Sequence, residues 1–156
     1  MMYEILVFIH IVGVILFLGV GTGSAFYKFM TDRSKNIQAI VEVNKTVVLA
    51  DWLFTTPAAF IQPISGIALA NTLNISLLEP WLFISIILYI ISCSLWLVAV
   101  YLQIKMKKIS QEALKKEEPL SSEYNKYIRY WTFLGVPSFL SMFSIVLLMM
   151  FHNWIF

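Results

Sequence analysis

Residues 50–66 read ADWLFTTPAAFIQPISG, an apolar stretch that nevertheless contains an acid, Asp51, and two prolines. The neighbouring residues are apolar on both sides, so a run from about residue 46 to residue 72 is long enough to cross a bilayer as a helix. Prolines and polar side chains are tolerated in such a helix where they face the inside of a helix bundle. The stretch therefore predicts a kinked membrane helix whose polar side points inward.

The composition of the chain also indicates a membrane protein. Of its 156 residues, 60% are hydrophobic and 13% are charged, whereas a soluble domain carries about 25% charged residues. Four apolar segments follow one another, at about residues 3–29, 46–72, 80–104 and 131–155. The first of them continues beyond signal-peptide length and is interpreted as a retained helix. The sequence thus predicts one all-α membrane domain over residues 1–156, a bundle of four transmembrane helices.

The basic residues predict the orientation of this bundle. All eleven Lys and Arg residues lie in or beside the first and third connections between the apolar segments. Because positive residues collect in cytoplasmic loops, both termini are predicted on the outer, periplasmic or extracellular, side. The basic third connection can be a docking site for anionic lipid or a partner, or a topology signal on a solvated loop. Nothing in this charge distribution points to nucleic acid.

Counting residues along the predicted helices sorts the polar side chains into two layers. The inner layer includes Asp51, Thr55, Thr56 and Lys28. An acid inside a span is costly unless it is paired or hydrated, so Asp51 is expected to pair with Lys28 or a neighbouring base. The alternative is a role for Asp51 with a proton or a ligand. The two threonine hydroxyls are also expected to help satisfy the carbonyl that Pro57 leaves free.

The outer layer centres on His10, with Gln62, Ser65 and Ser85 at a similar depth. A histidine in a membrane helix can be a hydrogen-bonded structural residue, a proton carrier or an axial ligand of haem iron. The only other histidine, His152, falls at the outer end of the fourth helix. A haem held by two histidines of one chain is therefore not expected.

Two further patterns concern packing. Gly19 and Gly23 form a small-xxx-small pair, which predicts a close approach of another helix. The aromatic and methionine side chains of the last two helices, Trp96 and Met142 among them, are interpreted as facing lipid or filling the core.

Several segments resemble a bacterial family of predicted four-helix membrane proteins, the domain of unknown function number 2269. The most specific is ADWLFTTP with the following QP at residues 62–63, and the likeness extends over nearly the whole chain. This resemblance implies a multi-pass protein of the bacterial inner (plasma) membrane and implies no activity.

A more distant likeness is to the HemJ-type protoporphyrinogen oxidases, four-helix membrane proteins thought to bind haem b. The run FIHIVGVILFLG, which contains His10, resembles the histidine-bearing first helix of that family, and Thr55-Thr56-Pro57 resembles its TTP motif. That family has a functional lysine where PWLFIS places Ser85. The resemblance therefore implies haem b on His10, beside Gln62, Ser65 and Ser85, without protoporphyrinogen oxidase activity.

Three kinds of function remain open at this point. The first is haem-linked membrane redox chemistry, with His10 on the iron and with a homodimer or a membrane redox partner. The second is a non-enzymatic transporter or accessory subunit in which Asp51 and His10 are polar stations for a proton, a metal ion or a small solute. The third is a purely structural subunit in the lipid bilayer.

Overall fold

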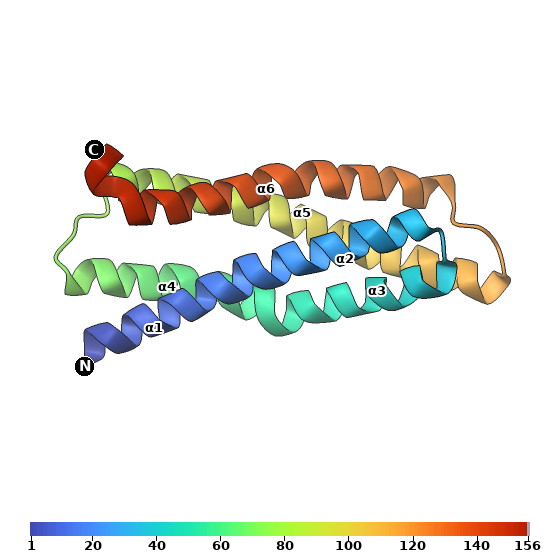
Figure 1. Ribbon diagram of the computed structural model, residues 1–156, viewed down its shortest axis with the longest axis horizontal. Coiled ribbons are helices and arrows are strands. Elements are labelled where there is room, and N and C mark those ends of the chain that lie inside the picture. Colours follow the sequence, from blue (N-terminus) through green and yellow to red (C-terminus); the bar gives the residue numbers. More distant parts are fainter. Residues whose placement is uncertain (156) are drawn as a thin grey trace.

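The computed structural model describes residues 1–155, with side chains through Asn153, and shows four long antiparallel helical rods (Figure 1). The first comprises α1 (Met2–Val14), the π-helical turn η1 (Ile15–Val20) and α2 (Gly21–Ser34). The second comprises α3 (Ile37–Ala50), the π-helical turn η2 (Asp51–Thr55) and α4 (Thr56–Thr72). Two uninterrupted helices, α5 (Pro80–Lys116) and α6 (Ser122–Ile155), complete the described chain.

Within these described residues, four helices are long and apolar enough to cross a membrane, which confirms that part of the sequence prediction. The connections are shorter than predicted because the helices continue past the apolar segments. The first is only residues 35–36, where Lys35 adopts a left-handed conformation (φ 57°) and Asn36 caps α3 by accepting the Ala39 N–H at 3.2 Å. The third is residues 117–121, again opened by a left-handed residue, Glu117 (φ 55°).

The two connections that join α2 to α3 and α5 to α6 lie at one end of the bundle (Figure 1). The two ends of the chain and the α4–α5 connection lie at the other. All Lys and Arg residues belong to the first end, so both termini share the end that is free of basic residues. That this end faces outward remains a prediction from the charge distribution.

The rods pack in chain order, α6 along α5, α5 against α3, and α2 and α1 against α3 and α4. Between the first and fourth rods, α6 contacts η1. Buried apolar residues form one cluster around Met106 and Trp131 and a smaller one around Phe17, Ala58 and Met142. Most large apolar side chains instead lie on the outer surface, as expected for helices that contact lipid.

Side chains of α5 donate hydrogen bonds to backbone carbonyls of the neighbouring helices α4 and α6. Pro63 has no N–H to offer the carbonyl of Ala59 one turn earlier, and the Tyr89 hydroxyl donates to that carbonyl instead. Toward α6, the hydroxyls of Ser92 and Ser138 lie 2.9 Å apart and each donates to the other's carbonyl, at 3.1 and 3.2 Å. These bonds fix the register of α5 against α4 and α6.

The predicted close approach at Gly19 and Gly23 is wrong. A Cβ atom added at Gly19 would meet nothing within 4 Å, and one at Gly23 would only touch its own helix at Tyr27. The close contact is at Gly13, where an added Cβ would collide with the side-chain amide of Gln62 and lie 3.3 Å from Ile61 Cγ2. Gly13 is the glycine that lets α1 lie directly on α4.

Candidate functional site

Three groups of buried polar side chains lie at different levels of the bundle. We name them the Lys28 network (Lys28, Asp32, Asn44, Ser110 and Tyr124), the η2 cluster (Asp51, Thr55, Trp96 and Gln103) and the His10 group (His10, Gln62 and Ser65). They differ in how completely their hydrogen-bonding atoms are satisfied, and this difference identifies the candidate site.

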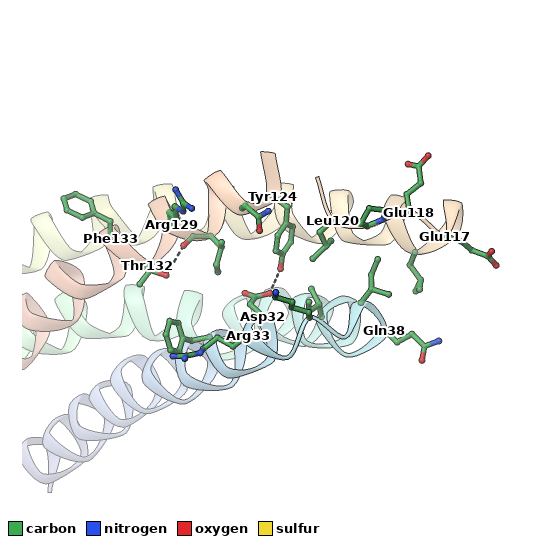
Figure 2. Close-up of a pocket in the computed structure, with 18 of the residues that line it drawn as sticks. Asp32, Arg33, Gln38, Glu117, Glu118, Leu120, Tyr124, Arg129, Thr132 and Phe133 are labelled. Carbon is green, nitrogen blue, oxygen red and sulfur yellow. Dashed lines mark hydrogen bonds between the residues drawn. The ribbon is translucent and has the colours of Figure 1, made fainter. Parts of the chain in front are cut away.

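The Lys28 network ties all four rods together at the charged end of the bundle. Lys28 is 1% exposed, and its ammonium donates to Asp32 Oδ2 at 3.0 Å, to Asn44 Oδ1 at 2.6 Å and to the Tyr124 hydroxyl at 3.2 Å. The Tyr124 hydroxyl donates to Asp32 Oδ1 at 2.6 Å, a bond visible in Figure 2. Asn44 Nδ2 donates to Ser110 Oγ at 3.0 Å. Every donor of Lys28 is used, so this network is a complete structural unit.

The expected pair between Asp51 and Lys28 is therefore wrong. The acid that neutralises Lys28 is Asp32, one turn further along the same helix. The two residues stand four positions apart, the spacing at which helical side chains lie on one face. Asp51 lies on η2 with a different set of neighbours.

The η2 cluster brings together polar side chains of the second and third rods. Asp51 and Thr55 stand at the two ends of η2 and are 4% and 1% exposed; Gln103 of α5 is 6% exposed. Thr55, Gln103 and Trp96 all present polar groups toward the Asp51 carboxyl. Four atoms of this cluster are buried without a hydrogen-bond partner among the described residues: Asp51 Oδ2, Thr55 Oγ1, Trp96 Nε1 and Gln103 Oε1.

This absence of partners also corrects the expectation for the threonines. The Thr55 hydroxyl donates to no backbone carbonyl of the described chain. It therefore does not satisfy the carbonyl that Pro57 leaves without an N–H donor. The π-helical turn directly before Thr56 instead changes the hydrogen-bonding pattern ahead of the proline.

All four residues of the η2 cluster line one cavity of about 390 Å³. Its other walls come from η1, α2 and the middle of α6, and they are largely apolar, with the aromatic residues Phe17, Phe26 and Trp131 among them. Small-molecule sites in proteins are of this size and combine apolar walls with a few convergent polar groups. Asp51 Oδ2 and Gln103 Oε1 are acceptors, the Thr55 hydroxyl can accept or donate, and Trp96 Nε1 is a donor. The two acceptors equip the cavity to hold a ligand that donates hydrogen bonds.

Sequence reasoning placed Asp51 and Thr55 in this inner layer and missed Trp96 as a polar participant. Thr56, also predicted, is half-buried and does not line the cavity. A usable signal was present in α5, where Ser92, Trp96, Ala99, Gln103 and Met106 alternate in steps of four and three residues. That spacing places them on one helix face, and the structure turns this face toward the bundle interior.

The His10 group lies between α1 and α4. Ser65 Oγ lies 2.8 Å from His10 Nδ1 and donates to the Ile61 carbonyl at 2.6 Å, an arrangement that suits the tautomer of His10 with its proton on Nδ1. Gln62 Nε2 donates to the His10 carbonyl at 2.8 Å. The structure thus brings three of the four predicted outer-layer residues together. The fourth, Ser85, donates to the Trp81 carbonyl of its own helix at 2.7 Å and has no hydrogen bond to the group.

The residues 1–153 contain no cluster of three or more His, Cys, Asp or Glu side chains that could hold a metal ion. A metal bound by protein ligands alone is not supported in this part of the chain. His10 does not line the cavity of the η2 cluster.

The family model described as a predicted integral membrane protein (DUF2269) matches residues 4–153. The chain belongs to this family. No curated protein and no solved structure matches the chain. For this member of the DUF2269 family, membership establishes an integral membrane protein, and its activity has to be inferred from the site.

Proposed function

We propose that the chain binds a small organic cation of the ammonium class in the cavity of the η2 cluster and works as a non-enzymatic membrane binding or transport protein. The observation that carries the proposal is the convergence of Asp51 Oδ2, Thr55 Oγ1 and Gln103 Oε1, all buried without partners, on one aromatic-walled cavity. Burying a carboxylate without a counter-charge is costly. A cationic ligand supplies both that charge and the missing donors.

The walls of the cavity favour an organic cation over a bare metal ion. An ammonium group over the face of a tryptophan or phenylalanine gains about 0.5–2 kcal/mol, and Phe17, Trp96 and Trp131 line the cavity. Metal ions require several ligands at fixed geometry, and the described residues supply no such set. The ligand class that matches both the acceptors and the rings is an alkyl- or arylammonium.

The test is calorimetric titration of the detergent-purified protein with tetramethylammonium, choline and benzylammonium. We expect binding that Asp51→Asn weakens by at least about tenfold, because a hydrogen bond to a charged group contributes about 1.5–3 kcal/mol. Glu42→Gln is the matched control, since Glu42 is an exposed acid on the same rod. Absence of binding by all three cations, or equal affinity of wild type and Asp51→Asn, would refute the proposal.

A second proposal, haem b on His10, is favoured by one observation in the His10 group. In the tautomer in which Nδ1 donates its proton to Ser65, the lone pair of the ring lies on Nε2, which is then the nitrogen available to bind iron. The bound haem would supply one-electron chemistry. A second copy of the chain or a membrane redox partner would exchange electrons with it. Ser65 and Gln62 would orient the ring.

The absorption spectrum of the purified protein tests this second proposal. A Soret band that disappears in His10→Ala and becomes weaker in Ser65→Ala is expected. A colourless preparation from haem-replete cells, or full haem occupancy in His10→Ala, contradicts it. Rescue of a strain that lacks protoporphyrinogen oxidase would contradict the proposed absence of that activity.

The location of the protein is proposed to be the bacterial inner (plasma) membrane. Support comes from the four apolar helices and from the collection of all Lys and Arg residues at one end of the bundle.

A further inference from the structure

A second, larger cavity of about 1470 Å³ opens at the charged end of the bundle, between α2 and the beginning of α6. We call it the α2–α6 groove. The α5–α6 connection and the start of α3 close its far end, and the Asp32–Tyr124 bond crosses its floor (Figure 2). It shares Phe29, Thr132 and Val136 with the cavity of the η2 cluster, but none of the four η2 cluster residues lines it.

One wall of the groove is apolar and runs along α6 toward the middle of the bundle. It contains Ile128, Phe133, Val136 and Pro137, which extend over about 13 Å of helix at 1.5 Å per residue. Phe133 is 75% exposed and Val136 is 56% exposed. The groove is therefore open sideways along a stretch of helix that is apolar enough to lie in the membrane.

Two arginines lie where this apolar wall meets the charged end of the bundle. Figure 2 shows Arg129 near Thr132 and Phe133 on α6, and Arg33 across the groove from them on α2. Neither forms an ion pair with a described residue, and the Arg33 guanidinium lies 5.6 Å from the centre of the Phe29 ring. Both guanidinium groups are exposed and have their charge free for a ligand.

The acids that line the groove do not cancel this charge. Asp32 on the floor is neutralised by Lys28 at 3.0 Å. Glu117 and Glu118 stand at the opposite end, beside the α5–α6 connection and away from Phe133 (Figure 2). The positive charge is thus concentrated at the level where the polar and apolar parts of the groove meet.

We propose that the α2–α6 groove binds an anionic phospholipid, with its phosphate between Arg33 and Arg129 and one acyl chain along Ile128, Phe133 and Val136. Guanidinium groups bind phosphate through paired N–H donors. Basic pockets between membrane helices, next to an apolar wall, are suited to lipid head groups. The site fits a phospholipid better than free phosphate because the wall adds apolar contact that an inorganic ion cannot use.

Native mass spectrometry of the purified protein, titrated with phosphatidylglycerol or with phosphatidylcholine of the same acyl chains, tests the proposal. We expect phosphatidylglycerol to bind about 25-fold more tightly, because each of the two arginines near the lipid phosphate contributes about a factor of five. The double variant Arg33→Gln/Arg129→Gln should lose this preference. The charge-matched control, Lys108→Gln/Lys116→Gln, changes two exposed lysines of α5 that do not line the groove and should keep it.

Three results would overturn the proposal. Equal binding of the two lipids by the wild type would exclude a charge-selective site. Loss of the preference in the lysine control as well would mean that only the overall charge matters. Displacement of phosphatidylglycerol by millimolar inorganic phosphate would show a site for a free anion. Unchanged thermal unfolding of both double variants verifies that the fold is kept.

Discussion

Lys28 and Asp51 are both buried ionisable side chains, yet only Lys28 has its hydrogen-bonding capacity filled. Its three N–H donors reach Asp32, Asn44 and Tyr124, whereas Asp51 Oδ2 reaches no partner in the described chain. A satisfied buried charge stabilises one arrangement of helices, and an unsatisfied one is a feature that ligand-binding sites retain. The two residues therefore have different consequences when they are replaced.

Removing the Lys28 charge should destabilise the bundle strongly. Lys28→Met leaves Asp32 and Asn44 without their shared donor, and breaking a buried pair in this way costs about 3–5 kcal/mol. Lys45→Met, in the exposed pair with Glu42, should cost less than about 1 kcal/mol. Unfolding of both variants in a denaturing detergent titration measures the difference, and equal losses would show that the Lys28 network contributes nothing beyond a surface pair.

Glycine positions offer a second comparison between single residues. In Gly13→Ala the new methyl group would press on the Gln62 amide and on Ile61, which should lower the free energy of unfolding by about 1–3 kcal/mol. Gly19→Ala points into open space and should be neutral or slightly stabilising, since alanine is the better helix former. The melting temperatures of the two variants in detergent test this difference. A larger drop in melting temperature for Gly19→Ala than for Gly13→Ala would mean that another chain packs at Gly19.

Between elements, the bond from Tyr89 of α5 to the Ala59 carbonyl of α4 compensates for a donor that Pro63 lacks. Tyr89→Phe should therefore lower the free energy of unfolding by about 1 kcal/mol or more. In a Pro63→Ala background the restored N–H satisfies the same carbonyl, and the cost of Tyr89→Phe should fall. A double-mutant cycle in thermal unfolding measures this coupling. Additive effects of the two changes would mean that the hydroxyl does not substitute for the proline's missing donor.

The elements themselves were predictable from sequence, and their ends and polar contacts were less so. Apolar segments define four spans, but α5 runs on to Lys116 because a charged sequence such as KMKKISQEALKK also favours helix. Asp51 could be recognised as unusual from its depth. Gln103, at the end of the third apolar segment, falls at the same level, whereas Trp96 was interpreted as packing and its place in the η2 cluster was missed. Lys28 was assigned the wrong acid because the first helix was predicted to end at about residue 29, before Asp32, whereas α2 continues to Ser34.

At the scale of the whole molecule, the common end shared by both termini (Figure 1) makes the orientation testable with few probes. In a Cys93→Ser background, cysteines placed at the exposed positions Ser34, Ser121 and Thr72 can be labelled in intact cells with a membrane-impermeant maleimide. We expect Thr72→Cys to react and the other two to react only after the cells are opened, because basic loops stay inside. The reverse pattern would overturn the predicted orientation.

The two π-helical turns, η1 and η2, lie in contact at the centre of the bundle. Their i→i+5 bonds enclose one residue more than an α-helical turn, and each residue of a helix accounts for about 100° of rotation. One residue more or fewer between His10 and Lys28 would therefore rotate α2 by about 100°, so that Lys28 would no longer face Asn44. During the divergence of the family, substitutions at residues 15–20 are tolerable, but the loss of a single codon there would rotate the whole of α2 away from its partners. Insertions and deletions among relatives should accordingly gather in residues 73–79 and 117–121 and spare both π-helical turns.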